Sequence, residues 1–201
     1  MTPVPRLILA SASKSRANLL RAAGVSVEII PANTDEDSVK ASMKAEDATV
    51  AQCAEMLAEL KALQVSQRTP GALVIGADQM LECEGQWFDK PKDLDGARQH
   101  LRTLRGKTHV LPTAVAVALN GSCIWHHVAF PKLTARAYSD AFIEEYMQMT
   151  GDAVLSSVGA YQLEGPGALL FSKIEGDFFT ILGLPLLELL GFLREHRAVP
   201  Q

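Results

Sequence analysis

The sequence predicts an α/β fold with a mixed central sheet. Short apolar runs, typical of buried strands, alternate with longer segments whose apolar residues recur at helical spacing. This alternation favours strand–helix–strand units. One pair of expected strands is instead joined by Asn120-Gly121, a preferred turn of antiparallel hairpins. With 201 residues, 48% of them hydrophobic, the chain can bury a proper core, and we expect one domain over 1–201.

The first part of the chain is expected to fold into strands and helices in turn. Its strands are short apolar or alternating runs, and its helices keep one face apolar. A polar, acidic stretch between them is interpreted as a loop. In order, we expect a strand at 7–10, a helix that stops at Gly24, a strand at 25–30, a loop at 33–47, a helix at 48–64 and a strand at 73–77.

The second part adds a hairpin, two further strands and three helices. Capping residues mark two helix starts, because Asp93 and Ser139 each precede a segment with helical periodicity. The expected elements are a hairpin at 81–88 around Glu84-Gly85, a helix at 94–104, strands at 109–119 and 124–130, a helix at 140–149 and an apolar helix at 185–196.

Composition excludes several classes of function. A formal net charge of −4, with no basic helix, offers no long-range attraction for nucleic acid. The three cysteines have no CxxC spacing and are expected to be reduced thiols. We find neither an apolar stretch of membrane-spanning length nor a signal peptide, so we expect a cytoplasmic protein with no membrane partner. An acidic protein can bind a triphosphate only through a local basic pocket or a metal.

The segment from Ser11 to Arg16 is a candidate phosphate site. It follows the first apolar strand and opens a helix, so backbone N–H groups and the positive end of the helix dipole face one point. The hydroxyls of Ser11 and Ser13 and the cations Lys14 and Arg16 would complete the site. The alternative is a helix capped by Ser13 whose basic residues are solvated.

Two residues, Asp78 and Glu36, are candidates for acid–base or metal chemistry. Asp78 ends a buried strand, where a carboxylate can deprotonate water or hold Mg²⁺, although an aspartate there can also bond local backbone. Glu36 lies in an acidic run. Its carboxylate is either a metal ligand or simply part of a solvated surface loop. His109 begins a strand, and we expect it to be packed and outside the site.

Several motifs stand in a characteristic order. They are Leu9-Ala10-Ser11-Ala12-Ser13, Gly76-Ala77-Asp78-Gln79, Asp89-Lys90-Pro91, Arg105-Gly106-Lys107-Thr108-His109, Gly159-Ala160-Tyr161-Gln162-Leu163-Glu164-Gly165 and Gly176-Asp177-Phe178-Phe179-Thr180. From Leu7 to about Leu190, the chain resembles the Maf family of nucleoside triphosphate pyrophosphatases, first named for effects on septum formation. The resemblance implies an elongated, two-lobed Maf/ITPase-like fold with a cleft between the lobes. It also implies hydrolysis of a nucleoside triphosphate to monophosphate and pyrophosphate, a divalent cation (Mg or Mn), and a homodimer, as in many relatives.

The resemblance also assigns roles to residues. Asp78 aligns with the proton acceptor and metal ligand, and Glu36 aligns with an acid that helps to hold the cation, next to Asp35. The residues expected to bind the substrate are Ser11, Arg16, Lys61 and Lys90. For Lys61, the sequence fits a solvent-facing position on a helix equally well. Lys90 directly precedes Pro91, which favours an extended backbone suited to holding a phosphate.

Departures from the family pattern point to the base. Glu164 stands where Gln is commoner, and Gln79 where Thr is commoner. A carboxylate accepts the two neighbouring donors of guanine, so Glu164 favours 7-methyl-GTP or another modified purine. Ser15 departs from this branch, where an aromatic residue would be expected. The alternative function is a nucleotide-binding regulator of cell division with little catalysis, which would not need Asp78.

Overall fold

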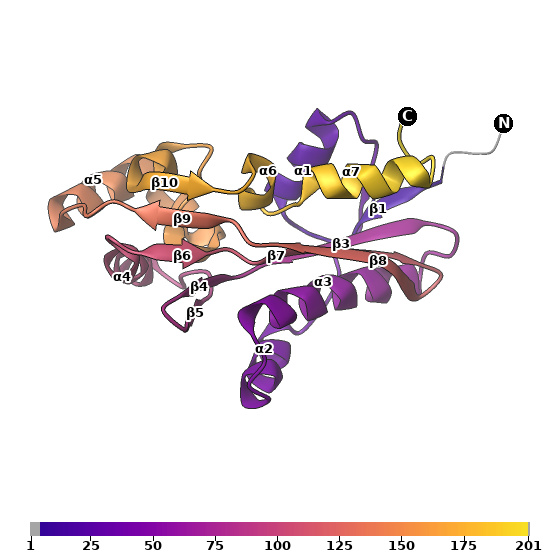
Figure 1. Cartoon of the computed structure of the whole chain (residues 1–201), viewed down its shortest axis with the longest axis horizontal. Coiled ribbons are helices and arrows are strands. Elements are labelled where there is room, and N and C mark those ends of the chain that lie inside the picture. The colour runs from indigo at the N-terminus through magenta and orange to yellow at the C-terminus, as the bar shows by residue number, and fades with distance from the viewer. Residues whose placement is uncertain (1–4, 201) are drawn as a thin grey trace. The chain divides into compact units, whose positions relative to one another are not determined.

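The computed structural model describes residues 5–200 and confirms an α/β fold (Figure 1). These residues form two compact units. Unit 1 contains residues up to Asp78, Thr113–Ala129 and the segment from Gly183 onward. Unit 2 contains Gln79–Pro112 and Phe130–Leu182.

Unit 1 contains a mixed five-stranded sheet with helices on both faces. The strand order is β2-β1-β3-β7-β8. Its elements are β1 (Leu7–Leu9), α1 (Lys14–Ala22), β2 (Glu28–Ile29), α2 (Glu36–Ala45), α3 (Val50–Ser66), β3 (Leu73–Gln79), β7 (Thr113–Leu119), β8 (Ser122–Ala129) and α7 (Leu186–Glu195). Strands β2, β1 and β3 are parallel and β7 and β8 antiparallel, so the predicted mixed sheet is confirmed. Helix α3 covers one face, with α1 and α7 on the other (Figure 1).

Unit 2 contains a second five-stranded sheet, in the order β10-β9-β6-β4-β5, with antiparallel pairing throughout. Its elements are β4 (Leu81–Cys83), β5 (Gln86–Phe88), α4 (Leu94–Leu104), β6 (Thr108–Val110), β9 (Lys132–Ala135), α5 (Asp140–Thr150), the 3₁₀ helices η1 (Gly151–Ser156), η2 (Val158–Ala160) and η3 (Pro166–Leu170), β10 (Phe171–Glu175) and α6 (Phe178–Ile181). Its core joins α4 and α5 to the sheet through fully buried Leu101, Leu133, Ile143 and Tyr146.

The helix caps and the hairpin turn expected from the sequence are confirmed. Each depends on residues only a few positions apart. Ser13, Asp93 and Ser139 each cap the helix that follows. At the β7–β8 turn, Asn120 and Gly121 both have positive φ (51° and 77°), as a type I′ hairpin turn requires.

Two sequence predictions were wrong. The stretch expected to be a loop at 33–47 contains α2, a helix with no buried residue and a polar, acidic composition that resembles a loop. Asp35 caps it, and Glu36 and Asp37 complement its dipole. The single strand expected at 109–119 is two strands in different sheets, β6 and β7. Pro112 lies between them, and a proline has no N–H to donate to a ladder.

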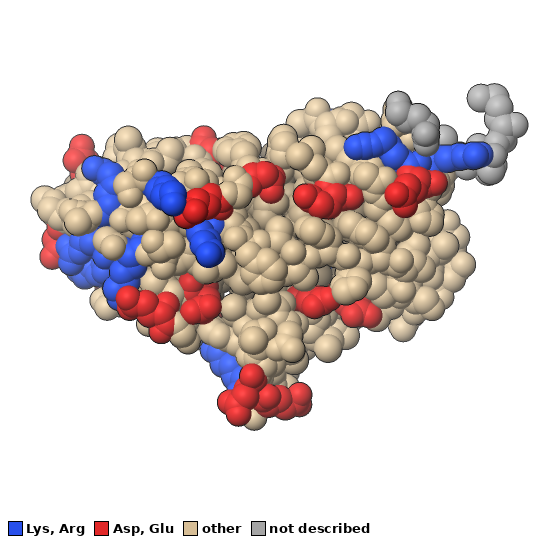
Figure 2. Space-filling model, in the orientation of Figure 1, with Lys and Arg blue, Asp and Glu red and all other residues tan. Residues whose placement is uncertain are grey.

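The face of the molecule in Figure 2 carries both acidic and basic side chains. Figure 2 shows acidic side chains gathered over α2. Within residues 5–200, no helix combines the length and apolarity that a bilayer crossing needs. All three cysteines are free thiols, as predicted.

Candidate active site

Parallel strands β1 and β3 place two candidate residues at one edge of the unit 1 sheet. Leu9 lies opposite Ile75, and the N–H of Ala10 donates to the Ile75 carbonyl at 2.7 Å. Ser11 therefore leaves β1 beside the end of β3, where Asp78 lies. The carboxyl ends of parallel strands are where α/β proteins bind ligands, so the position itself favours a site.

Arg16 ties three chain segments together at this edge. Its Nε donates to the Gly183 carbonyl at 2.7 Å, and one Nη donates to the Ala77 carbonyl at 2.8 Å and to Ser11 Oγ at 3.2 Å. Ser13 caps α1 by accepting from the Arg16 N–H, so the predicted cap is confirmed, while Arg16 is not simply solvated. The side chain is partly buried and fixed, which keeps a guanidinium charge at the sheet edge.

The Ser11 hydroxyl faces the site as a donor. Its oxygen accepts from the Ser13 N–H at 3.2 Å as well as from Arg16 at 3.2 Å. A hydroxyl has two acceptor sites and one hydrogen. With both acceptor sites used, the hydrogen is left to donate, which is what an anionic oxygen requires.

Asp78, Lys61 and Glu36 form an ionic cluster in which Asp78 and Lys61 are buried and Glu36 is partly exposed. Lys61 Nζ donates to Asp78 Oδ1 at 2.6 Å and lies 2.6 Å from Glu36 Oε1. Asp78 and Lys61 are only 6% and 8% exposed, so the solvent-facing alternative for Lys61 is wrong. Asp35 turns away from this cluster, because both its oxygens accept from Ser38.

Close packing of α3 on β3 brings Lys61 to Asp78. Gly76 and Asp78 face the same side of β3, because alternate residues of a strand do. A Cβ built on Gly76 would lie 2.1 Å from the Ala58 carbonyl oxygen and 2.7 Å from the Ala62 nitrogen. Only glycine allows α3 to pass so near, and Lys61 stands on the turn of α3 that makes this contact.

The charges around Asp78 influence its proton affinity. Burial raises the pKa of the Asp78 carboxyl, and the attraction of Lys61 and Arg16 opposes that rise. Burial likewise lowers the pKa of Arg16, while Asp78 and Glu36 oppose the change. A carboxylate whose pKa is raised by burial has a greater proton affinity than an ordinary aspartate, which is the direction that a general base requires.

The Glu36 and Asp78 carboxylates also fit a hard divalent cation. Both approach the same Lys61 nitrogen, so they face one point in space. Mg²⁺ is commonly held by one or two carboxylates, with waters and substrate phosphates completing its shell. Among residues 5–200, no group of three or more His, Cys, Asp or Glu side chains is placed to hold a metal ion. Such an ion would therefore depend on the substrate for further ligands.

The remaining residues that were predicted to bind the substrate or determine its base lie in α1 and in unit 2. Ser15 is partly buried in the first turn of α1. In unit 2, Lys90 is exposed after β5, and Glu164 is exposed in the turn between η2 and η3. Gln79 Nε2 donates to the carbonyls of Thr180 and Ile181 at 3.0 and 3.1 Å, so both its N–H groups fasten α6. The roles of these residues stay predictions.

His109 lies outside the site, as expected. It is fully buried in unit 2, and its Nε2 is 2.7 Å from the Tyr161 hydroxyl. Sequence reasoning gave no role to Gly76 or to the carbonyl oxygens of Ala77 and Gly183 that hold Arg16. The only signal was that Gly76 falls inside one of the family motifs and that Gly183 lies close to the end of another.

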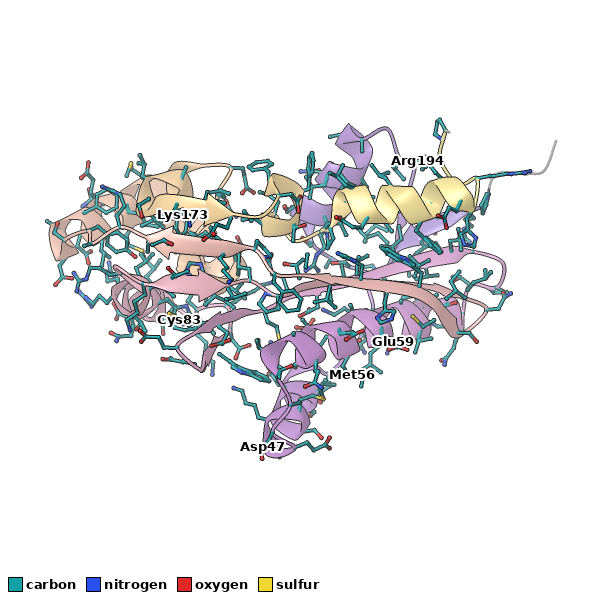
Figure 3. The ribbon with its side chains drawn as sticks, viewed as in Figure 1. Asp47, Met56, Glu59, Cys83, Lys173 and Arg194 are labelled. Carbon is teal, nitrogen blue, oxygen red and sulfur yellow. The ribbon has the colours of Figure 1, made fainter. Side chains whose placement is uncertain are left out.

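A hollow on unit 1 provides a contrast with this cluster. It has a volume of about 480 Å³, and its walls carry four carboxylates. Its lining residues are Met43, Glu46, Asp47, Ala48, Gln52, Glu55, Met56 and Glu59. Asp47, Met56 and Glu59 are labelled on α3 and the segment before it in Figure 3. Such an acidic lining repels a triphosphate, whereas the edge with Ser11 and Arg16 offers a hydroxyl donor and a positive charge.

Comparison with known proteins agrees with the motifs. The profile of the family described as Maf-like protein matches residues 6–196. A protein of Granulibacter bethesdensis named nucleoside triphosphate pyrophosphatase is 54% identical over 194 residues, covering 96% of this chain and 98% of its own. One of Paramagnetospirillum magneticum with the same name is 56% identical, covering 94% and 97%. A 7-methyl-GTP pyrophosphatase of Brucella abortus biovar 1 is 46% identical, covering 96% and 98%. The chain therefore belongs to the Maf-like protein family.

Proposed function

We propose that this protein is a nucleoside triphosphate pyrophosphatase, which hydrolyses its substrate to a nucleoside monophosphate and pyrophosphate. The observation that carries the proposal is that two carboxylates, one of them buried, lie in the same unit as a hydroxyl and a guanidinium at the end of its parallel strands. Asp78 and Glu36 supply carboxylates, while Ser11 and Arg16 supply a donor and a positive charge. The relatives named above bear names for this activity.

Each residue of the cluster then has a defined task. Asp78 accepts a proton from the water that attacks the α-phosphorus. The bond from the α-phosphorus to its bridging oxygen breaks, pyrophosphate leaves with the electron pair, and the water oxygen stays on the monophosphate. Ser11 donates to a phosphate oxygen, and Arg16 offsets the negative charge that develops.

We further propose a divalent cation, Mg²⁺ or Mn²⁺, held by Glu36 and Asp78. When bound, it neutralises phosphate charge and so makes pyrophosphate a better leaving group. Lys90, exposed in unit 2, is proposed as a further phosphate ligand.

The substrate class is proposed to be a modified purine nucleotide, 7-methyl-GTP above all. Glu164 is exposed, so its carboxylate is accessible to a ligand. Two acceptor oxygens match the two neighbouring donors of guanine, and their charge favours a cationic 7-methylguanine. Gln79, with its N–H groups on α6, supports this role by holding a segment rather than by donating to the base.

We propose that both units act as one catalytic domain. The chain passes between them at four points, after Asp78, Pro112, Ala129 and Leu182. The family profile runs through all of these points. The expected cytoplasmic location and homodimer stay predictions.

The test is product analysis in ¹⁸O-labelled water. A panel containing 7-methyl-GTP, GTP, dTTP and UTP should yield monophosphate and pyrophosphate in equal amounts, with the label on the monophosphate. Label found only in orthophosphate would make the protein a stepwise phosphatase. Nucleotide binding without turnover of any member would instead favour a nucleotide-binding regulator.

A further inference from the structure

The Lys61 ammonium occupies the point toward which Glu36 and Asp78 both turn. Its nitrogen is 2.6 Å from an oxygen of each carboxylate. These are the two side chains proposed to hold the divalent cation. An ammonium group and a metal ion cannot both occupy that point. Lys61 must therefore move before a metal can take its place between the two oxygens that it now contacts.

The cluster is already close to neutral as it stands. The two carboxylates are matched by Lys61 and by Arg16, whose guanidinium is attracted to both acids. Lys40 adds a weaker contact, 4.0 Å from the second oxygen of Glu36. A divalent ion that entered alone would leave excess positive charge in a largely buried place, which is unfavourable. A triphosphate brings the negative charge that removes this penalty.

We propose that Lys61 keeps the Glu36–Asp78 pair closed to divalent cations until a nucleotide arrives, and that its ammonium then passes to phosphate oxygens. This rests on the proposed function of the cluster. The lysine stem is flexible, so a change of rotamer moves the ammonium while α3 stays packed on β3. Metal and nucleotide then bind with positive coupling, for which about 5- to 150-fold is typical.

The test is a Mn²⁺ titration of the free protein, followed by electron paramagnetic resonance. Lys61→Met removes the ammonium and keeps the length of the side chain. We expect it to bind Mn²⁺ at least about fivefold more tightly than the wild type does. The matched control is Lys40→Met, which removes a lysine that lies 4.0 Å from Glu36, farther than the 2.6 Å of Lys61, and it should bind Mn²⁺ as the wild type does. In Lys61→Met, a proton could take the place of the ammonium on Asp78 and compete with Mn²⁺. The titrations are therefore made at neutral and at mildly alkaline pH.

Two further measurements make the result decisive. Mn²⁺ should raise the Tm of Lys61→Met more than that of the wild type, because a ligand stabilises the state that binds it. Wild-type protein saturated with a non-hydrolysable triphosphate analogue should bind Mn²⁺ more tightly than free protein, after correction for Mn²⁺ on the analogue.

Equal Mn²⁺ affinity in wild type and Lys61→Met overturns the proposal, and so does equal affinity in free and analogue-bound wild type. If Lys61→Met does not fold, Lys61→Gln takes its place, and the wild-type comparison needs neither variant. Failure of the proposed function would appear separately, as absence of monophosphate and pyrophosphate, because the titrations require no turnover.

Discussion

Replacing Gly76 by alanine should damage both stability and catalysis. The added Cβ would lie 2.1 Å from the Ala58 carbonyl oxygen, whereas real Cβ contacts do not fall below 3.0 Å. Helix α3 and strand β3 must therefore separate by about 0.9 Å, and backbone cannot yield as a flexible side chain can. Overpacking of this kind costs about 1–3 kcal/mol. The 2.6 Å contact of Lys61 with Asp78 would lengthen to the limit of hydrogen bonding.

The catalytic cost follows from the same displacement. A shift of about 1 Å away from a productive geometry can reduce turnover by about 10²-fold. We expect kcat/KM to fall by about that factor in Gly76→Ala. The Tm should fall by about 2–4 °C for each kcal/mol lost, as in chains of 150–250 residues.

The matched control is Gly191→Ala in α7. A Cβ there meets nothing within 4 Å, and alanine is the better helix former, so its Tm should hold or rise. Steady-state kinetics and a thermal melt of all three proteins decide the matter. If Gly76→Ala retains wild-type kcat/KM and Tm, the close approach of α3 to β3 does not position Lys61, and the reasoning fails.

Three other predictions follow. Asp78→Asn should lose about 10²–10⁴-fold in kcat while binding nucleotide, as general bases do; more than about a tenth of wild-type turnover would rule out the proton-acceptor role. Burial lowers the pKa of His109 from 6.5 to about 4, so the folded protein binds a proton there less readily than the unfolded chain does. The free energy of unfolding should therefore fall by up to about 3 kcal/mol as the pH drops from 6.5 to about 4. Melts of wild type and the non-titrating His109→Gln across these pH values should differ in slope, and equal slopes would contradict the assignment. Glu164→Gln should reduce the preference for 7-methyl-GTP over dTTP by about 1–3 kcal/mol in relative kcat/KM, whereas a wild type that hydrolyses dTTP equally well would remove the basis for that role.

The sequence allowed accurate prediction where local chemistry decides the structure. Helix caps such as Asp93 and Ser139, and the turn at Asn120-Gly121, depend on residues a few positions apart. Strand β10 has no buried residue and forms by pairing with β9, a partner distant in sequence that periodicity cannot reveal. Helix α2 did carry a local signal, the Asp35 cap, but none of its residues is buried and its acidic start was interpreted as part of a loop.

In the candidate site, the residues themselves could be predicted from the sequence, but their arrangement could not. Family resemblance identified Ser11, Arg16, Glu36, Lys61 and Asp78, and all five lie in unit 1 with direct contacts linking Ser11 to Arg16 and Lys61 to both acids. It did not indicate that Lys61 stands between the two carboxylates. That position depends on a helix passing close to a strand, a long-range packing fact that no spacing of residues encodes.

The bond from Arg16 to the Gly183 carbonyl links residues 167 positions apart. During synthesis, every other contact of Arg16 described above is available once Ala77 has left the ribosome, but this one awaits almost the whole chain. Closing so long a loop is slow relative to local folding. The guanidinium therefore takes its final orientation only in a nearly complete polypeptide. A fragment ending before Gly183 retains all five candidate side chains, yet its Arg16 lacks one of the three oxygens that orient the guanidinium.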